Sequence, residues 1–149
     1  MIKTIHPIAG VVGFLTILTF WTSTLYSELF TSYATVAFVK ASVVKGLYLL
    51  VPAMIIVGAT GMSMGQRRKD APAVAKKKRM PIIAANGLLI LVPAAIYLNA
   101  KAGTGAFDTS FYVVQVVELI VGAANLTLMA MSIRDGRTMT ARRRNLQKK

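Results

Sequence analysis

Four apolar runs, each about as long as a bilayer is thick, constrain the fold of this chain more than any other feature. The first is the uncharged stretch between Lys3 and Glu28, and the others cover 46–66, 80–100 and 108–134. A hydrocarbon core of about 30 Å needs about 20 apolar residues of helix. The sequence therefore predicts an all-α integral membrane protein, a four-helix bundle of up-down topology that forms a single transmembrane domain over residues 1–149.

Helix start and stop signals give the expected bounds of these spans. Pro7 fits a first helical turn, where its missing N–H has no partner in any case, and Asp108 begins a helix-start signal for the last span. Pro52 and Pro93 predict kinks near the middle of the second and third spans. We expect helices at approximately 5–27, 42–64, 80–100 and 110–133, a basic cytoplasmic loop at 65–79 and a basic tail at 134–149.

The positive charge is confined to segments that would share one side of the membrane. The 65–79 loop, the tail and Lys3 hold 15 cations against Asp70 and Asp135, which accounts for the whole net charge of +13. By the positive-inside rule this side is the cytoplasm, so both termini lie there in a bacterial inner membrane. We expect anionic lipids to bind this face. No aromatic residue is interleaved to stack a base, so nucleic acid is not an expected partner.

Several kinds of chemistry are excluded or lack a sequence signal. The chain has no cysteine, which excludes disulfides, thiolate nucleophiles and cysteine-ligated metal centres. No serine or threonine has a histidine or lysine at the spacing of a known nucleophile motif, so no nucleophilic triad is indicated. The sequence also contains no glycine-rich phosphate-binding loop. The first run is longer than the apolar part of a signal peptide, so we expect it to remain as an anchor. No residue is assigned a catalytic role.

The fourth run carries polar residues on one helical face. Gln115, Glu118 and Asn125 are spaced at i, i+3 and i+10. A carboxylate in hydrocarbon costs about 2.5 to 3.5 kcal/mol, so this face must meet protein, water or a ligand. Lys45 approaches from the same side of the membrane and is the expected partner of Glu118. The expected buried polar residues are Glu118, Lys45, Gln115, Asn125, Asn86 and Asn99.

His6 is the only histidine and begins the first span. A single histidine cannot form a zinc site, but it can ligate haem iron, and a twofold homodimer could supply the second ligand. Small residues follow it at helical spacing, as a flat macrocycle would require. The predicted haem b site is therefore His6, as the iron ligand, with Ala9, Gly13 and Thr16. The alternative is an interfacial histidine followed by a close helix contact.

The chain resembles the small four-span inner-membrane proteins that many bacteria encode without assigned function. The resemblance covers the whole length and rests on His6-Pro7, Phe20-Trp21-Thr22-Ser23-Thr24, and Arg79-Met80-Pro81 with Asn86-Gly87. It implies a multi-pass membrane protein and transfers no functional residues.

Three functions are consistent with these features. The first is a ligand-binding membrane module. Its most specific version binds haem b for electron transfer, and less specific versions bind a quinone or a lipid. The second is a non-catalytic accessory or assembly subunit of a larger membrane complex, or a homo-oligomer. The third is a small proton- or cation-coupled transporter built on Glu118 and Lys45. If a cofactor is bound, we expect it near His6 and not around the carboxylate.

Overall fold

The computed structural model describes residues 2–65 and 71–146, and they fold entirely into helices and short connections. Four helical spans are long and apolar enough to cross a membrane: Thr4–Phe30, Tyr33–Gly61, Lys78–Gly103 and Thr109–Thr138. The all-α, multi-pass membrane fold predicted from the sequence is confirmed. The helical elements are α1 (Ile2–Phe30), α2 (Tyr33–Gly65), α3 (Ala71–Ala85), η1 (Asn86–Leu91), α4 (Val92–Gly103) and α5 (Thr109–Leu146).

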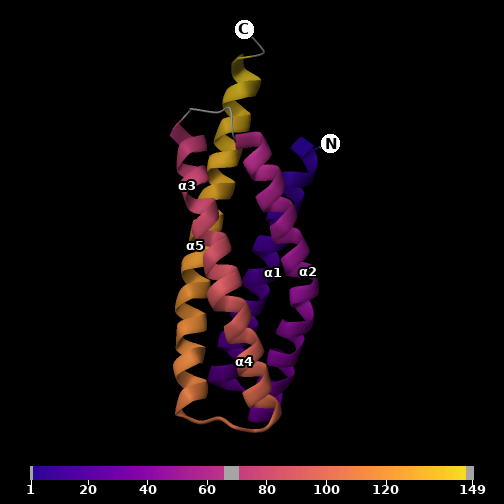
Figure 1. Ribbon diagram of the computed structural model, residues 1–149, viewed down its shortest axis with the longest axis vertical. Helices are drawn as coiled ribbons and strands as arrows, with labels where there is room; N and C mark the ends of the chain where they lie inside the picture. Colours follow the sequence, from indigo (N-terminus) through magenta and orange to yellow (C-terminus); the bar gives the residue numbers. More distant parts are fainter. Residues whose placement is uncertain (1, 66–70, 147–149) are drawn as a thin grey trace.

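The four spans form one bundle in which consecutive spans run in opposite directions (Figure 1). α1 packs on α2 and α5, and the third span, built from α3, η1 and α4, closes the ring between α2 and α5. Both chain ends lie at the same end of the bundle, which we call the terminal end (Figure 1). The opposite end, where α1 turns into α2 and α4 into α5, is called the distal end.

The helices are longer than the sequence analysis expects. α1 and α2 are separated only by Thr31 and Ser32, so α2 begins nine residues before the approximate bound of 42 expected for the second helix. The Ser27 carbonyl accepts hydrogen bonds from the Thr31 N–H and hydroxyl, at 3.2 and 2.8 Å, and these bonds hold a tight turn. α2 therefore starts at Tyr33, which places Lys40 two turns inside the helix.

Two further bounds differ at the terminal end. α3 begins at Ala71, within the expected 65–79 loop, and α5 continues to Leu146 through most of the expected tail. Residues 137–146 contain no proline and several strong helix formers, so nothing in that stretch ends the helix. The remaining parts of the expected loop and of the expected tail, at residues 66–70 and 147–149, lie outside the described residues.

The third span is irregular at its centre. Residues 86–91 form a π-helix, in which the Val92 N–H donates to the Gly87 carbonyl, five residues earlier. Pro93 follows directly and has no N–H to donate to the carbonyl four residues before it. The irregularity expected near Pro93 thus takes the form of η1, a short π-helix that widens the backbone. Such segments are frequent at functional sites.

The apolar core lies in two separate clusters. The distal cluster contains Val36, Leu98, Ala102 and Phe111, and the cluster nearer the terminal end contains Ile17, Ile83 and Met129. At the distal end, the Phe107 ring stacks on Tyr33 and meets Phe111 edge to face. The distal end of the bundle is thus well packed, and the second cluster lies beside the candidate site described below.

Asp108 fixes the start of α5. Its Oδ1 accepts hydrogen bonds from the Phe111 N–H at 3.0 Å and the Ser110 hydroxyl at 2.6 Å, and Lys101 Nζ donates to its Oδ2 at 2.5 Å. The bond from Lys101, followed by those from Ser110 and Phe111, lowers the pKa of Asp108 well below its usual value of 3.8. The helix-start signal read from the sequence is confirmed.

This lowered pKa gives the fold a pH dependence. A carboxyl group with a lower pKa in the folded state stabilises the fold when ionised, and that contribution is lost as the pH falls below about 4. We expect wild type to melt a few degrees above Asp108→Asn at neutral pH. The difference should shrink steadily between about pH 4 and pH 2 in thermal melts followed by circular dichroism. A difference that is the same at every pH would contradict this.

Candidate intramembrane binding site

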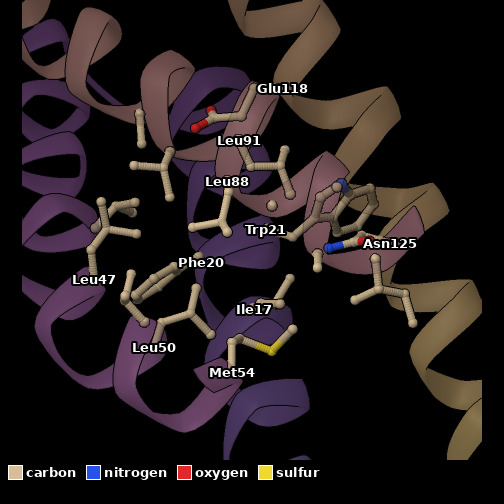
Figure 2. Close-up of a pocket in the computed structure, with 18 of the residues that line it drawn as sticks. Ile17, Phe20, Trp21, Leu47, Leu50, Met54, Leu88, Leu91, Glu118 and Asn125 are labelled. Carbon is tan, nitrogen blue, oxygen red and sulfur yellow. The ribbon is translucent and has the colours of Figure 1, made fainter. Parts of the chain in front are cut away.

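A cavity of about 460 Å³ lies in the middle of the bundle, and Ile17 and Ile83 of the cluster nearer the terminal end line it. All four spans contribute to its walls, and the wall of the third span includes the π-helical residues Gly87, Leu88 and Leu91 (Figure 2). The lining is almost wholly apolar. Its hydrogen-bonding side chains are Trp21, Thr24, Glu118 and Asn125.

One side of the cavity reaches the lipid-facing surface. α2 packs against α3 and α4, but among the described residues no Cα atom of α2 lies within 8 Å of one in η1. The side chains on the two sides of this gap line the cavity and are also exposed, Ile55 by 63% and Leu88 by 58%. In a bilayer, hydrocarbon surrounds these exposed side chains. The gap between α2 and η1 is therefore a lateral opening from the cavity into the membrane.

Asn125 is a buried polar residue in the wall of the cavity. Its side chain is 0% exposed, and neither its Oδ1 nor its Nδ2 has a hydrogen-bond partner within the described part of the chain. A buried amide without partners costs free energy, so buried polar groups are nearly always hydrogen-bonded. Asn125 lines the cavity, and neighbouring side chains must shift before a ligand can reach its donor and its acceptor, because neither amide atom is exposed.

Trp21 packs against α5 about one helical turn before Asn125. Its Nε1 donates a 2.9 Å hydrogen bond to the Leu119 carbonyl of α5. Gly122 makes room for the ring, because a Cβ added there would lie 2.9 Å from the Trp21 Cδ1. The indole is thus fixed against α5 with its ring in the cavity wall.

A charged cluster lies towards the distal end of the cavity. Lys40 Nζ donates to Glu118 Oε2 at 2.8 Å, and Gln115 Nε2 donates to the same oxygen at 3.2 Å. Lys40 is 0% exposed and the Glu118 side chain 13% exposed. The expected pairing of Glu118 with Lys45 is therefore wrong, and Lys45 is exposed. The early start of α2 is the reason, because it places Lys40 inside the helix, where its ammonium group reaches Glu118.

Glu28 is a member of this cluster that the sequence analysis missed. It lies close enough to interact electrostatically with both Lys40 and Glu118, and its Oε1 is buried without a hydrogen-bond partner among the described residues. The cluster thus joins two carboxylates to one ammonium group. A sequence signal was present, since Glu28 and Lys40 lie on either side of Thr31-Ser32. A two-residue turn at that point makes the two helices face each other and brings Glu28 close to Lys40.

The predicted haem face packs against other helices. His6 is buried, and its Nδ1 lies 2.8 Å from the Thr60 hydroxyl of α2. A Cβ added to Gly13 would lie 3.3 Å from the Met54 Sδ, so methionine side chains cover this part of the face. Ala9 is buried, and the Thr16 hydroxyl donates to the Val12 carbonyl. None of the four predicted residues lines the cavity.

Haem ligation by His6 stays a prediction. It is tested by absorbance spectra of the purified protein, oxidised and then reduced with dithionite. A Soret band that shifts in His6→Ala would assign His6 as the ligand, and a spectrum without the band would reject haem.

The other polar residues expected to be buried differ in their exposure. Gln115 and Asn125 are buried as expected, whereas Asn86 on η1 and Asn99 on α4 are only half-buried. No group of three or more potential metal ligands occurs in the described ranges 2–65 and 71–146.

Comparison of the chain with models of protein families, with curated proteins and with solved structures gives no match.

Proposed function

We propose that this protein is a membrane module that binds an apolar small molecule in its central cavity. The observation that carries the proposal is the unpartnered Asn125 amide in the wall of an otherwise apolar cavity that opens towards lipid. Ligand sites in proteins have this composition, with a mainly hydrophobic lining and a few polar groups that set orientation. Their volumes of about 300 to 1,000 Å³ include that of this cavity.

Charge distribution supports an orientation for this module. Arg79 and Arg134 lie at the terminal end, where Arg79 pairs with Asp135 at 2.5 Å. We propose that this end faces the cytoplasm of a bacterial inner membrane, where anionic lipids interact with its cations. The module is proposed to act as a homo-oligomer or as an accessory subunit of a larger membrane complex.

Trp21 provides a direct assay for binding, because it is the only tryptophan of the chain and it lines the cavity. Bromine in contact with an indole ring quenches its fluorescence. We expect p-dibromobenzene to quench Trp21 saturably in protein solubilised in mild detergent. Saturation separates binding at a site from random collisions in the micelle, which give quenching that rises linearly with concentration.

A matched pair of glycine variants locates the quencher. Gly58 lines the cavity and Gly10 does not, and at both positions an added Cβ meets no atom within 4 Å. Gly58→Leu should fill part of the cavity and weaken binding about tenfold or more, whereas Gly10→Leu should leave it unchanged. Linear quenching in wild type, or equal binding in both variants, would contradict the proposal.

Transport of protons or cations is a second candidate, favoured by the Glu28–Lys40–Glu118 cluster. Ionisable groups inside membrane spans often mark ion or proton paths. The transporter hypothesis now involves Lys40 in place of Lys45. It is tested with the protein in liposomes, where Glu118→Gln should stop proton-coupled flux. Flux that is unchanged would leave Glu118 a structural role.

A further inference from the structure

We propose that the molecule held in the cavity is an uncharged lipid alcohol or phenol. Its hydroxyl group binds the Asn125 amide, and its hydrocarbon chain leaves the cavity through the opening between α2 and η1. This inference rests on the proposed function and adds the chemical class of the ligand, its orientation and its route.

The two free atoms of Asn125 select the head group. Nδ2 can donate and Oδ1 can accept, and both are buried without partners among the described residues. A hydroxyl group satisfies both atoms, since its oxygen accepts a bond from Nδ2 while its hydrogen is donated to Oδ1. A carbonyl or ether oxygen only accepts, so it would leave Oδ1 without a donor. A hydrocarbon would leave both atoms unpaired.

Charge in the cavity wall disfavours ionised head groups. Among the described residues, Glu118 is the only charged one in the lining, and its carboxylate lies two helical turns from Asn125, about 10 Å along α5. A carboxylate or phosphate head would find no cation among the described residues of the wall. A cationic head would have to compete with Lys40, which already holds Glu118 at 2.8 Å. An uncharged head avoids both penalties.

The lateral opening accounts for the hydrocarbon chain. Ile55 and Leu88 stand on its two sides, lining the cavity and facing lipid. Gly87 adds no side chain to the η1 wall, and a Cβ there would meet nothing within 4 Å. A lipid that diffuses in the bilayer can therefore enter head first between α2 and η1. Its chain then remains in hydrocarbon and stays out of contact with water.

Trp21 fluorescence tests both head group and orientation, because the indole lines the cavity and packs on Gly122, about one helical turn from Asn125. Three probes are titrated into the detergent-solubilised protein: a long-chain primary alcohol with bromine next to the hydroxyl group, the same alcohol with bromine at the far end, and a bromoalkane of equal length. We expect strong, saturable quenching by the first. The second should compete with the first but quench weakly. The alkane should bind about tenfold more weakly.

Asn125→Leu is the decisive variant. It should bind the alcohol and the alkane equally, because the amide that distinguishes them is gone. Its retained circular dichroism spectrum and its retained saturable quenching by p-dibromobenzene would show that fold and cavity are intact. A long-chain carboxylate tested at neutral pH should compete poorly with the alcohol in wild type.

The outcomes separate this inference from the proposed function. Saturable quenching by p-dibromobenzene, with equal affinities for alcohol and alkane in wild type, would overturn the inference and leave the proposed function standing. An alcohol preference that persists in Asn125→Leu would overturn it too, as would stronger quenching by the far-end bromine. Failure of every compound to quench saturably would reject the proposed function itself.

Discussion

Asn125→Leu is expected to stabilise the protein against unfolding while removing its preference for a hydroxyl-bearing ligand. The Asn125 amide is 0% exposed and both of its polar atoms lack partners within the described structure. Leaving a buried polar group unsatisfied costs about 1 to 3 kcal/mol, and leucine has a similar size without that cost. We expect a gain of about 1 to 2 kcal/mol, measured as a higher midpoint of thermal unfolding in detergent without added ligand.

Asn99→Leu is the control for this substitution. Asn99 lies half-buried on α4 and does not line the cavity, so the same change there should have a smaller effect on stability. Added long-chain alcohol should raise the melting midpoint of wild type more than that of Asn125→Leu, because only wild type also binds the hydroxyl group. A lower melting midpoint for Asn125→Leu than for wild type would show that the amide is hydrogen-bonded in the folded protein.

Lys40→Met is expected to be strongly destabilising. Lys40 is fully buried, and it is the cation that faces the two carboxylates of Glu28 and Glu118. Removing one partner of a buried ion pair leaves an uncompensated charge and costs about 3 to 5 kcal/mol. We expect Lys40→Met to lower the thermal midpoint by many degrees, followed by circular dichroism in detergent. Adding Glu118→Gln should restore part of the loss, because it removes one of the two unpaired carboxylates.

Lys45→Met provides a matched control on the same helix. Lys45 is exposed and does not contact Glu118 in the structure, so its replacement should change stability by no more than about 0.5 kcal/mol. A loss in Lys45→Met as large as that in Lys40→Met would mean that Lys45 holds the carboxylate after all. The comparison therefore distinguishes the pair seen in the structure from the pair expected from the sequence.

The stability and binding effects expected at Asn125 have opposite signs. Sites that break a local rule of folding, such as a buried unpaired amide, are where a protein gives up stability for function. The π-helix beside the cavity is a second irregularity of this kind, since Pro93 and η1 interrupt the regular hydrogen bonds of the third span. Two departures from regular structure thus meet around one cavity.

The candidate site was only partly predictable from the residues. The polar face of the fourth span, with Gln115, Glu118 and Asn125, follows from helical spacing alone, and two of the three are buried as expected. The partner of Glu118 did not follow, because its identity depends on where α2 begins. That start depends on a two-residue turn stabilised by Thr31 and Ser27, a local feature with a weak sequence signal.

The sequence by itself determined that this chain crosses a membrane four times as helices. Runs of about 20 apolar residues leave no other way to satisfy the backbone in hydrocarbon. Only the tertiary structure decided that Lys40 neutralises Glu118 and that Asn125 lines a cavity open to lipid between α2 and η1. The physical reason is that periodicity fixes which residues share a face of one helix. Cavities and ion pairs depend on the register and spacing between helices, which packing sets.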